Sequence, residues 1–103
     1  MKGEIKEYIR GYTLRTGTMF EGFGFPRIMG EIGALLYLSS EPLSLDEIAG
    51  ILNVSKGSVS TNCRSLKRLR YIRISQKYPG RKDYYEFSGN LFSSLKSSIT
   101  VFV

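Results

Sequence analysis

Apolar residues recur at intervals of three, four and seven from Ile5 to Phe23, which is the period of an amphipathic helix. Gly11 and Gly17 each weaken this helix by up to about 1 kcal/mol relative to alanine, and the glycine-rich stretch before Pro26 ends it. Pro26 suits the first turn of a second helix, where a missing N–H is harmless. We expect that helix to carry apolar residues through Leu38 and to end near residues 39–42.

Two further helices are predicted, separated by a short turn. Residues 44–47 have the form of a capping box, in which Ser44 and Glu47 satisfy free backbone amides at a helix start. Asn53 tolerates the left-handed conformation that ends a helix, and Ser55 can cap the next one. Small Ala49 lets the two helices approach closely. The fourth helix has one narrow apolar stripe, formed by Val59, Cys63, Leu66 and Leu69.

After the fourth helix the period of the pattern shortens from about 3.6 to 2. Residues 71–75 alternate like a half-buried strand, residues 78–82 are typical of a turn, and residues 84–87 form a returning strand. The order helix, helix, turn, helix, hairpin predicts a winged helix-turn-helix. The expected fold class is therefore mainly α with a small β-hairpin wing (α+β).

We expect a single domain over residues 1–103, with the helix-turn-helix at 44–70 and the wing at 71–87. A last helix is predicted in residues 90–103. The segments 1–22 and 90–103 carry more apolar surface than a small winged helix can cover, and large apolar patches usually mark an interface. This predicts a homodimer through Ile5, Tyr8, Ile9, Tyr12, Leu91, Leu95, Ile99 and Phe102.

The charge of the chain is concentrated in one segment. The 103 residues carry a net charge of +6, but residues 53–83 alone hold nine Lys or Arg against one acid, a net +8. Such a concentration favours a polyanionic partner. On the predicted fourth helix the polar residues that suit contact with double-stranded DNA are Ser55, Lys56, Ser58, Ser60, Thr61, Arg64, Lys67 and Arg68. On the predicted wing they are Lys77, Arg81 and Lys82.

The composition also excludes several classes of site. The chain has no histidine and one cysteine, Cys63, so Cys/His zinc sites and Ser–His or Cys–His catalytic arrangements are excluded. Asp46 and Glu47 lie in a first helical turn, where acids favour the helix dipole, so we interpret them as structural rather than catalytic. We expect no enzyme activity, cofactor or metal. With no 20-residue apolar run and an acidic N-terminus in place of a signal peptide, we expect a cytoplasmic protein with no membrane partner.

Four segments, residues 23–30, 40–49, 53–60 and 80–86, resemble the GbsR-type branch of the MarR-like transcriptional regulators. The resemblance covers residues 20–87 and implies a winged-helix DNA-binding domain in a homodimer that binds pseudo-palindromic DNA and often represses transcription. It implies that residues 55–60 begin the recognition helix and that Arg81 enters the minor groove. The sequence departs from the pattern at Gly80, where an acid often precedes that arginine, and at Cys63, usually a larger aliphatic residue.

Other interpretations remain open from the sequence. A winged helix can serve protein–protein contacts in the transcription machinery, or bind DNA without sequence preference. The aromatic residues of the first two helices could line a pocket for a small-molecule effector, but we favour core or dimer packing for them. Cys63 could be a redox switch, but its place on the apolar stripe favours a buried core residue. Tyrosines near the wing could stack on single-stranded bases.

Overall fold

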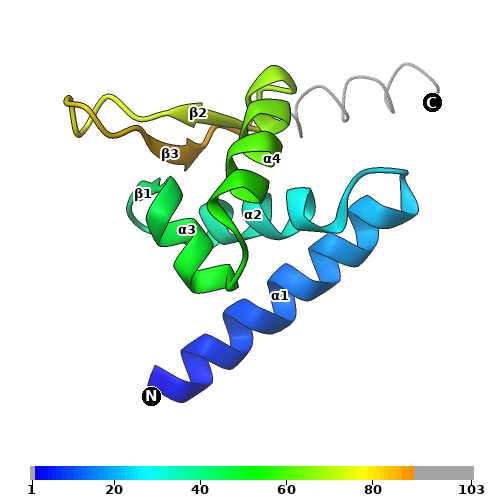
Figure 1. Cartoon of the computed structure of the whole chain (residues 1–103). Helices are drawn as coiled ribbons and strands as arrows, with labels where there is room; N and C mark the ends of the chain where they lie inside the picture. Colours follow the sequence, from blue (N-terminus) through cyan, green and yellow to red (C-terminus); the bar gives the residue numbers. More distant parts are fainter. Residues whose placement is uncertain (1, 90–103) are drawn as a thin grey trace.

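The computed structural model describes residues 2–89, with side chains from Glu7 onward. Its four helices and the two strands of the wing follow one another in the order expected from the sequence, and an additional short strand lies between the second and third helices (Figure 1). The helices are α1 (Lys2–Gly22), α2 (Arg27–Leu38), α3 (Leu45–Leu52) and α4 (Lys56–Arg68), and the strands are β1 (Leu43–Ser44), β2 (Ile72–Ile74) and β3 (Tyr84–Phe87). The last predicted helix, with Leu91, Leu95, Ile99 and Phe102, lies outside the described residues.

The long helix α1 crosses α2 at a pair of glycines. A Cβ atom added to Gly30 would lie 2.7 Å from the carbonyl oxygen of Thr16 and 2.9 Å from the Cα of Gly17. Only hydrogen side chains allow the two backbones to approach this closely. Gly17 therefore has a packing role that offsets its low helix propensity, which the sequence alone did not reveal.

The core lies where α2, α3, α4 and the sheet meet. Ile32, Ile48, Val59, Leu66 and Ile72 are almost completely buried there. The ring of Tyr71 covers Gly33 so closely that any side chain at position 33 would overlap it. Tyr71 also meets Phe20 and Phe87 edge to face, with ring centroids 6.1 and 5.1 Å apart.

The capping signals are formed as predicted. The Ser44 hydroxyl accepts a hydrogen bond from the Glu47 amide at 3.2 Å, and the Glu47 carboxylate accepts one from the Ser44 amide at 2.9 Å. Asn53 ends α3 with a left-handed φ of 57°. The prediction for Pro26 was off by one position, because α2 begins at Arg27 and Pro26 is its N-cap rather than part of its first turn.

The sheet has three antiparallel strands in the order β1-β3-β2, so the expected two-stranded hairpin was incomplete. Leu43 pairs with Tyr85, and Ser44 pairs with Tyr84, while Ile74 pairs with Tyr85 on its other side. β1 has only two residues and is too short to show an alternating pattern in the sequence. The result is a winged helix-turn-helix, in which the loop between β2 and β3 projects away from the helices (Figure 1).

Candidate nucleic-acid interface

Helix α4 is held by its inner face, and its outer face is left open. Val59, Cys63 and Leu66 are buried against the other elements, and the amide of buried Asn62 donates to the Ser58 carbonyl oxygen at 2.8 Å. The N-cap of α4 is Ser55, whose hydroxyl accepts a hydrogen bond from the backbone amide of Ser58 at 3.1 Å. Burial of these residues fixes the rotation of α4, and hence which side chains face solvent.

The outermost line of α4 consists of Gly57, Thr61, Arg64 and Arg68, at spacings of four, three and four residues. All four are exposed, and this spacing places them on one side of a helix. A Cβ atom on Gly57 would meet nothing within 4 Å, so the first turn presents bare backbone. Sequence reasoning did not single out Gly57, although its spacing from Thr61 was the available signal.

The other predicted residues of α4 flank this line. Lys67 and Lys56 are exposed, whereas Ser58 and Ser60 are half-buried. The Ser60 hydroxyl lies 3.5 Å from the Arg64 guanidinium, on the same helix. The structure thus brings the cations and Thr61 to one surface, while the Ser55 hydroxyl is engaged in capping.

The wing loop, residues 75–83, carries the three predicted cations in different environments. Arg81 is exposed and forms no hydrogen bond or ion pair with any residue that the structure describes. It follows Gly80, whose φ of 157° is one that side-chain-bearing residues rarely adopt. Lys77 and Lys82 are exposed too, but each forms an ion pair with an acid outside the wing, Lys77 with Glu41 and Lys82 with Asp46.

Glu41, just before β1, holds the first half of the wing loop. Its carboxylate accepts a hydrogen bond from the Lys77 ammonium at 2.7 Å and another from the Tyr78 hydroxyl at 3.1 Å. These hydrogen bonds, together with the charge of Lys77, lower the pKa of Glu41 below its ordinary value. The Tyr78 ring packs on Tyr84 of β3 with centroids 4.9 Å apart.

Asp46, in the first turn of α3, holds the second half of the loop and the start of α4. One carboxylate oxygen lies 3.2 Å from the Lys56 ammonium, and the other lies 3.5 Å from the Lys82 ammonium. The hydrogen bond from Lys56 is the main cause that lowers the pKa of Asp46. Sequence reasoning placed Asp46 correctly in a first helical turn but did not reveal that it links two cationic elements.

Cys63 is buried, as its place on the apolar stripe indicated, with 1% of its surface exposed. Burial raises the pKa of its thiol from 9.0 to about 11. A protonated, enclosed thiol is unreactive. Among the described residues no group of three or more His, Cys, Asp or Glu side chains could hold a metal ion.

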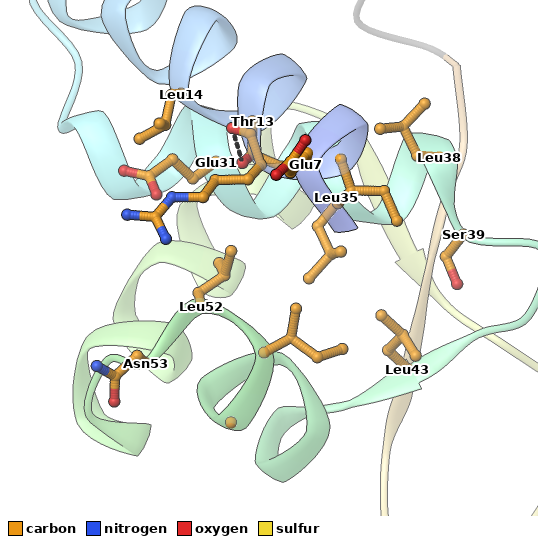
Figure 2. Close-up of a pocket in the computed structure, with 14 residues that line it drawn as sticks. Glu7, Thr13, Leu14, Glu31, Leu35, Leu38, Ser39, Leu43, Leu52 and Asn53 are labelled. Atoms are coloured by element: carbon orange, nitrogen blue, oxygen red, sulfur yellow. Dashed lines mark hydrogen bonds between the residues drawn. The ribbon is translucent and has the colours of Figure 1, made fainter. Parts of the chain in front are cut away.

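A cleft of about 940 Å³ lies between the N-terminal half of α1 and the ends of α2 and α3. Leu35 and Leu38 of α2 and Leu43 and Leu52 across the gap border it (Figure 2). α1 contributes Leu14 together with the polar side chains of Glu7, Arg10 and Thr13. The cleft ends at Asn53, in the turn that leads into α4.

The predicted dimer residues of α1 fall into two groups. Tyr8 is 63% exposed, whereas Ile9 packs partly against the core and Tyr12 stacks on Tyr37 of α2 at a centroid distance of 6.0 Å. Met19 and Phe23 continue the helix face of Tyr8 and are 49% and 75% exposed. The side chain of Ile5 lies outside the described ones.

The sequence matches the model of the MarR family over residues 23–82, which is more than half of the chain. The chain belongs to the MarR family. The match spans α2, the helix-turn-helix and most of the wing, which are the elements that build the basic surface described above. In the described part of this family member no helix is long and apolar enough to cross a membrane.

Solved structures share the fold. A transcriptional regulator is 28% identical, with a TM-score of 0.75 over 82% of this chain and 58% of that one, so the chain spans little more than half of that regulator. MepR from S. aureus, in a complex with DNA, is 17% identical, with a TM-score of 0.61 over 99% of this chain and 76% of that one. A MarR/EmrR family transcriptional regulator from Acinetobacter sp. ADP1 is 20% identical, with a TM-score of 0.59 over 97% and 72%. No curated protein matches the sequence significantly.

Proposed function

We propose that this MarR-family chain is a cytoplasmic, sequence-specific regulator of transcription that binds double-stranded DNA as a homodimer and acts by binding rather than catalysis. The observation that carries the proposal is the outer face of α4, where Thr61, Arg64 and Arg68 lie in line and no acid interrupts the helix. The relatives described as transcriptional regulators, and the MepR structure that contains DNA, support it. The motifs quoted from the sequence favour membership of the GbsR-type branch.

In this proposal α4 enters the major groove by its N-terminal half. Bare backbone at Gly57 permits close approach, Thr61 and Arg64 contact base edges, and Lys67 and Arg68 contact phosphates. Lys56, Ser58 and Ser60 line the flank near the helix N-terminus, where free amides favour a phosphate. The Ser55 hydroxyl caps α4, so its contribution is to order the first turn.

The wing contributes Arg81 to the minor groove. Arg81 has no intramolecular partner among the described residues, so its guanidinium is free to enter a narrow, A·T-rich groove, whose potential attracts arginine. Lys77 and Lys82 add positive charge at the phosphates beside it.

The homodimer uses the face of α1 that carries Tyr8, together with the segment 90–103. Tyr8 and Met19 on α1, with Phe23 directly after it, leave large apolar side chains in solvent, as an interface does before its partner binds. A two-fold axis would place two copies of α4 one DNA turn apart on a pseudo-palindromic site.

Selection of bound sites from a random duplex pool tests this function. We expect enrichment of a sequence with two inverted half-sites whose centres are about 10–10.5 base pairs apart or a multiple of that. Binding without enrichment would indicate a nonspecific architectural protein. Absence of binding at low salt would contradict the proposal and favour a protein–protein role.

A small apolar effector is a second part of the proposal, carried by the cleft between α1, α2 and α3. Its volume of about 940 Å³ falls within the range of about 300–1,000 Å³ typical of small-molecule sites. Its lining combines leucines and isoleucines with polar side chains, among them the charged residues Glu7, Arg10 and Glu31. A thermal-shift screen of uncharged aromatic compounds tests it, because a bound compound raises the Tm.

The control for this screen lies on the same helix. Leu14→Glu places a charge inside the cleft, whereas Thr18→Glu places one at an exposed position of α1 outside both the cleft lining and the proposed dimer face. Compounds that stabilise the parent chain should stabilise the Thr18 variant and not the Leu14 variant. Equal stabilisation of both variants by a compound would show that it does not bind in the cleft. If no compound raises the Tm of the parent chain, the cleft is not an effector site.

A further inference from the structure

Two acids from outside the wing hold its loop at both ends. Glu41 precedes β1 by two residues and binds Lys77 and Tyr78, which follow β2. Asp46 follows β1 by two residues and binds Lys82, which precedes β3. The five residues Glu41, Asp46, Lys77, Tyr78 and Lys82 are called the wing anchor below.

The two acids of the wing anchor flank β1, the short strand that joins the wing to the helices. β1 is hydrogen-bonded to β3, so the backbone fixes only the base of the wing, at Tyr84 and Tyr85. The loop beyond that base is held by side chains. Glu41 binds its first limb, at Lys77 and Tyr78, and Asp46 binds its second limb, at Lys82. Arg81 lies between the two limbs, next to Lys82.

Asp46 also joins the two elements that the proposed function assigns to DNA. Its second carboxylate oxygen lies 3.2 Å from the ammonium of Lys56 in the first turn of α4. A single side chain thus connects the start of the candidate recognition helix to the wing loop. Movement of the wing loop relative to α4 would therefore stretch or break an ion pair with Asp46.

We propose that Glu41 and Asp46 are positioning residues for DNA binding, which set the pose of the wing loop relative to α4 and so determine how well Arg81 reaches the minor groove. This inference rests on the proposed function. Both acids would otherwise weaken binding, because a carboxylate near a DNA-binding face repels phosphates. Each anchor contact is exposed and individually weak, but together the contacts restrict a loop that carries three proposed DNA contacts.

The first experiment needs no DNA. Limited trypsin digestion compares the chain carrying Glu41→Gln and Asp46→Asn with the parent chain. We expect cleavage after Arg81 or Lys82 to be at least about fivefold faster in the double variant, because cleavage follows local opening of the loop. Equal rates would overturn the anchor, whatever the chain binds.

A matched control removes the same charge without touching the anchor. Glu7→Gln with Glu21→Gln removes two acids from α1 and leaves the wing sequence unchanged. Glu7 forms no ion pair within the described part of the chain, and Glu21 lies 3.8 Å from Arg27 rather than near the loop. The control variant should be cleaved at the parent rate. If cleavage rises equally in both variants, loss of charge rather than loss of the anchor is the cause, and the proposal fails.

The second experiment is a double-mutant cycle on the duplex found by site selection. We expect Arg81→Ala to lower affinity about tenfold in the parent and control backgrounds, and about threefold or less in the Glu41/Asp46 variant. A tenfold loss in all three backgrounds would show that the acids do not position Arg81. If the double variant does not fold, judged by thermal unfolding, the single variants Glu41→Gln and Asp46→Asn carry the same test with smaller changes.

The two experiments separate the two proposals. A chain that binds no duplex but shows fast trypsin cleavage only in the Glu41/Asp46 variant retains the anchor and contradicts the proposed function. A chain that binds a selected duplex but shows no change in cleavage or in the cycle retains the function and contradicts the anchor.

Discussion

Left-handed residues end three of the helices in the described part of the chain. Gly24 follows α1 with a φ of 88°, Asn53 ends α3, and Arg70 follows α4 with a φ of 61°. The Tyr71 amide donates to the Leu66 carbonyl oxygen at 3.0 Å, so α4 ends in a Schellman motif with arginine in the usual place of glycine. Such a conformation costs a non-glycine residue about 1–2 kcal/mol. Burial of the Tyr71 ring directly afterwards offsets that cost.

Cys63 gives a prediction at this scale. Its raised pKa of about 11 leaves about 100-fold less thiolate at pH 8 than the ordinary value of 9.0 does, and burial restricts access further. We therefore expect an aromatic disulfide reagent to modify the folded chain at least about 100-fold more slowly than the chain in guanidinium. Absorbance at the wavelength of the released thiol measures both rates. Similar rates of modification in the folded chain and in guanidinium would contradict burial of the thiol and support the redox-switch interpretation.

The crossing of α1 and α2 governs packing at the scale of the elements. Gly17 and Gly30 bring the two backbones together, while Tyr8 and Met19 of α1 remain exposed. The helix propensity of α1 is poor, so its stability in the chain comes from this packing, as in most protein helices.

Two glycine substitutions test the crossing. Gly30→Ala forces a Cβ atom into the α1 backbone at 2.7 Å, and we expect it to lower the free energy of unfolding by about 1–3 kcal/mol. Gly50→Ala, in α3, adds a Cβ atom that meets nothing within 4 Å, and should raise it by about 0.4–1 kcal/mol. Urea denaturation followed by circular dichroism measures both. Equal effects of the two substitutions would contradict the close crossing.

The sequence predicted most of these elements because local signals mark them. The capping box at Ser44 and the turn residue Asn53 place α3 within a residue, and the change of period after Arg70 places the wing. β1 was missed because two residues carry no period, and its pairing with β3 is a long-range contact. The anchor was missed for a similar reason, since Glu41 and Lys77 are 36 residues apart and an ion pair leaves no local pattern.

At the scale of the whole molecule, the basic segment is less uniform than its sequence suggests. Lys56, Lys77 and Lys82 are paired with acids from outside the segment, and Arg73 is paired with Glu86 inside the sheet. The cations without such partners in the described structure concentrate on α4 and at Arg81. The net charge of +8 over residues 53–83 therefore overestimates the positive potential at the wing, where two lysines are paired with acids. It also does not show that most of the unpaired cations lie on α4.

The homodimer is the prediction at this scale. Multi-angle light scattering at tens of micromolar should give twice the chain mass of 11.6 kDa. Tyr8→Glu, on the exposed face of α1, should shift the mass toward the monomer, because it places a charge in the interface. Ile51→Glu changes an exposed apolar residue of α3, 55% accessible, and should leave the dimer intact. A monomer of the parent chain with and without DNA would refute the prediction.

The central claim, that α4 reads bases through Thr61 and Arg64, is tested most directly by measuring affinity for every single-base variant of the selected duplex. Arg64→Ala should change preference at one or two base positions by about 1–3 kcal/mol. Lys67→Ala should weaken binding to all variants alike and lower the slope of log affinity against log salt by about one. If both substitutions lower affinity uniformly across the library, α4 contributes charge alone and does not read the sequence.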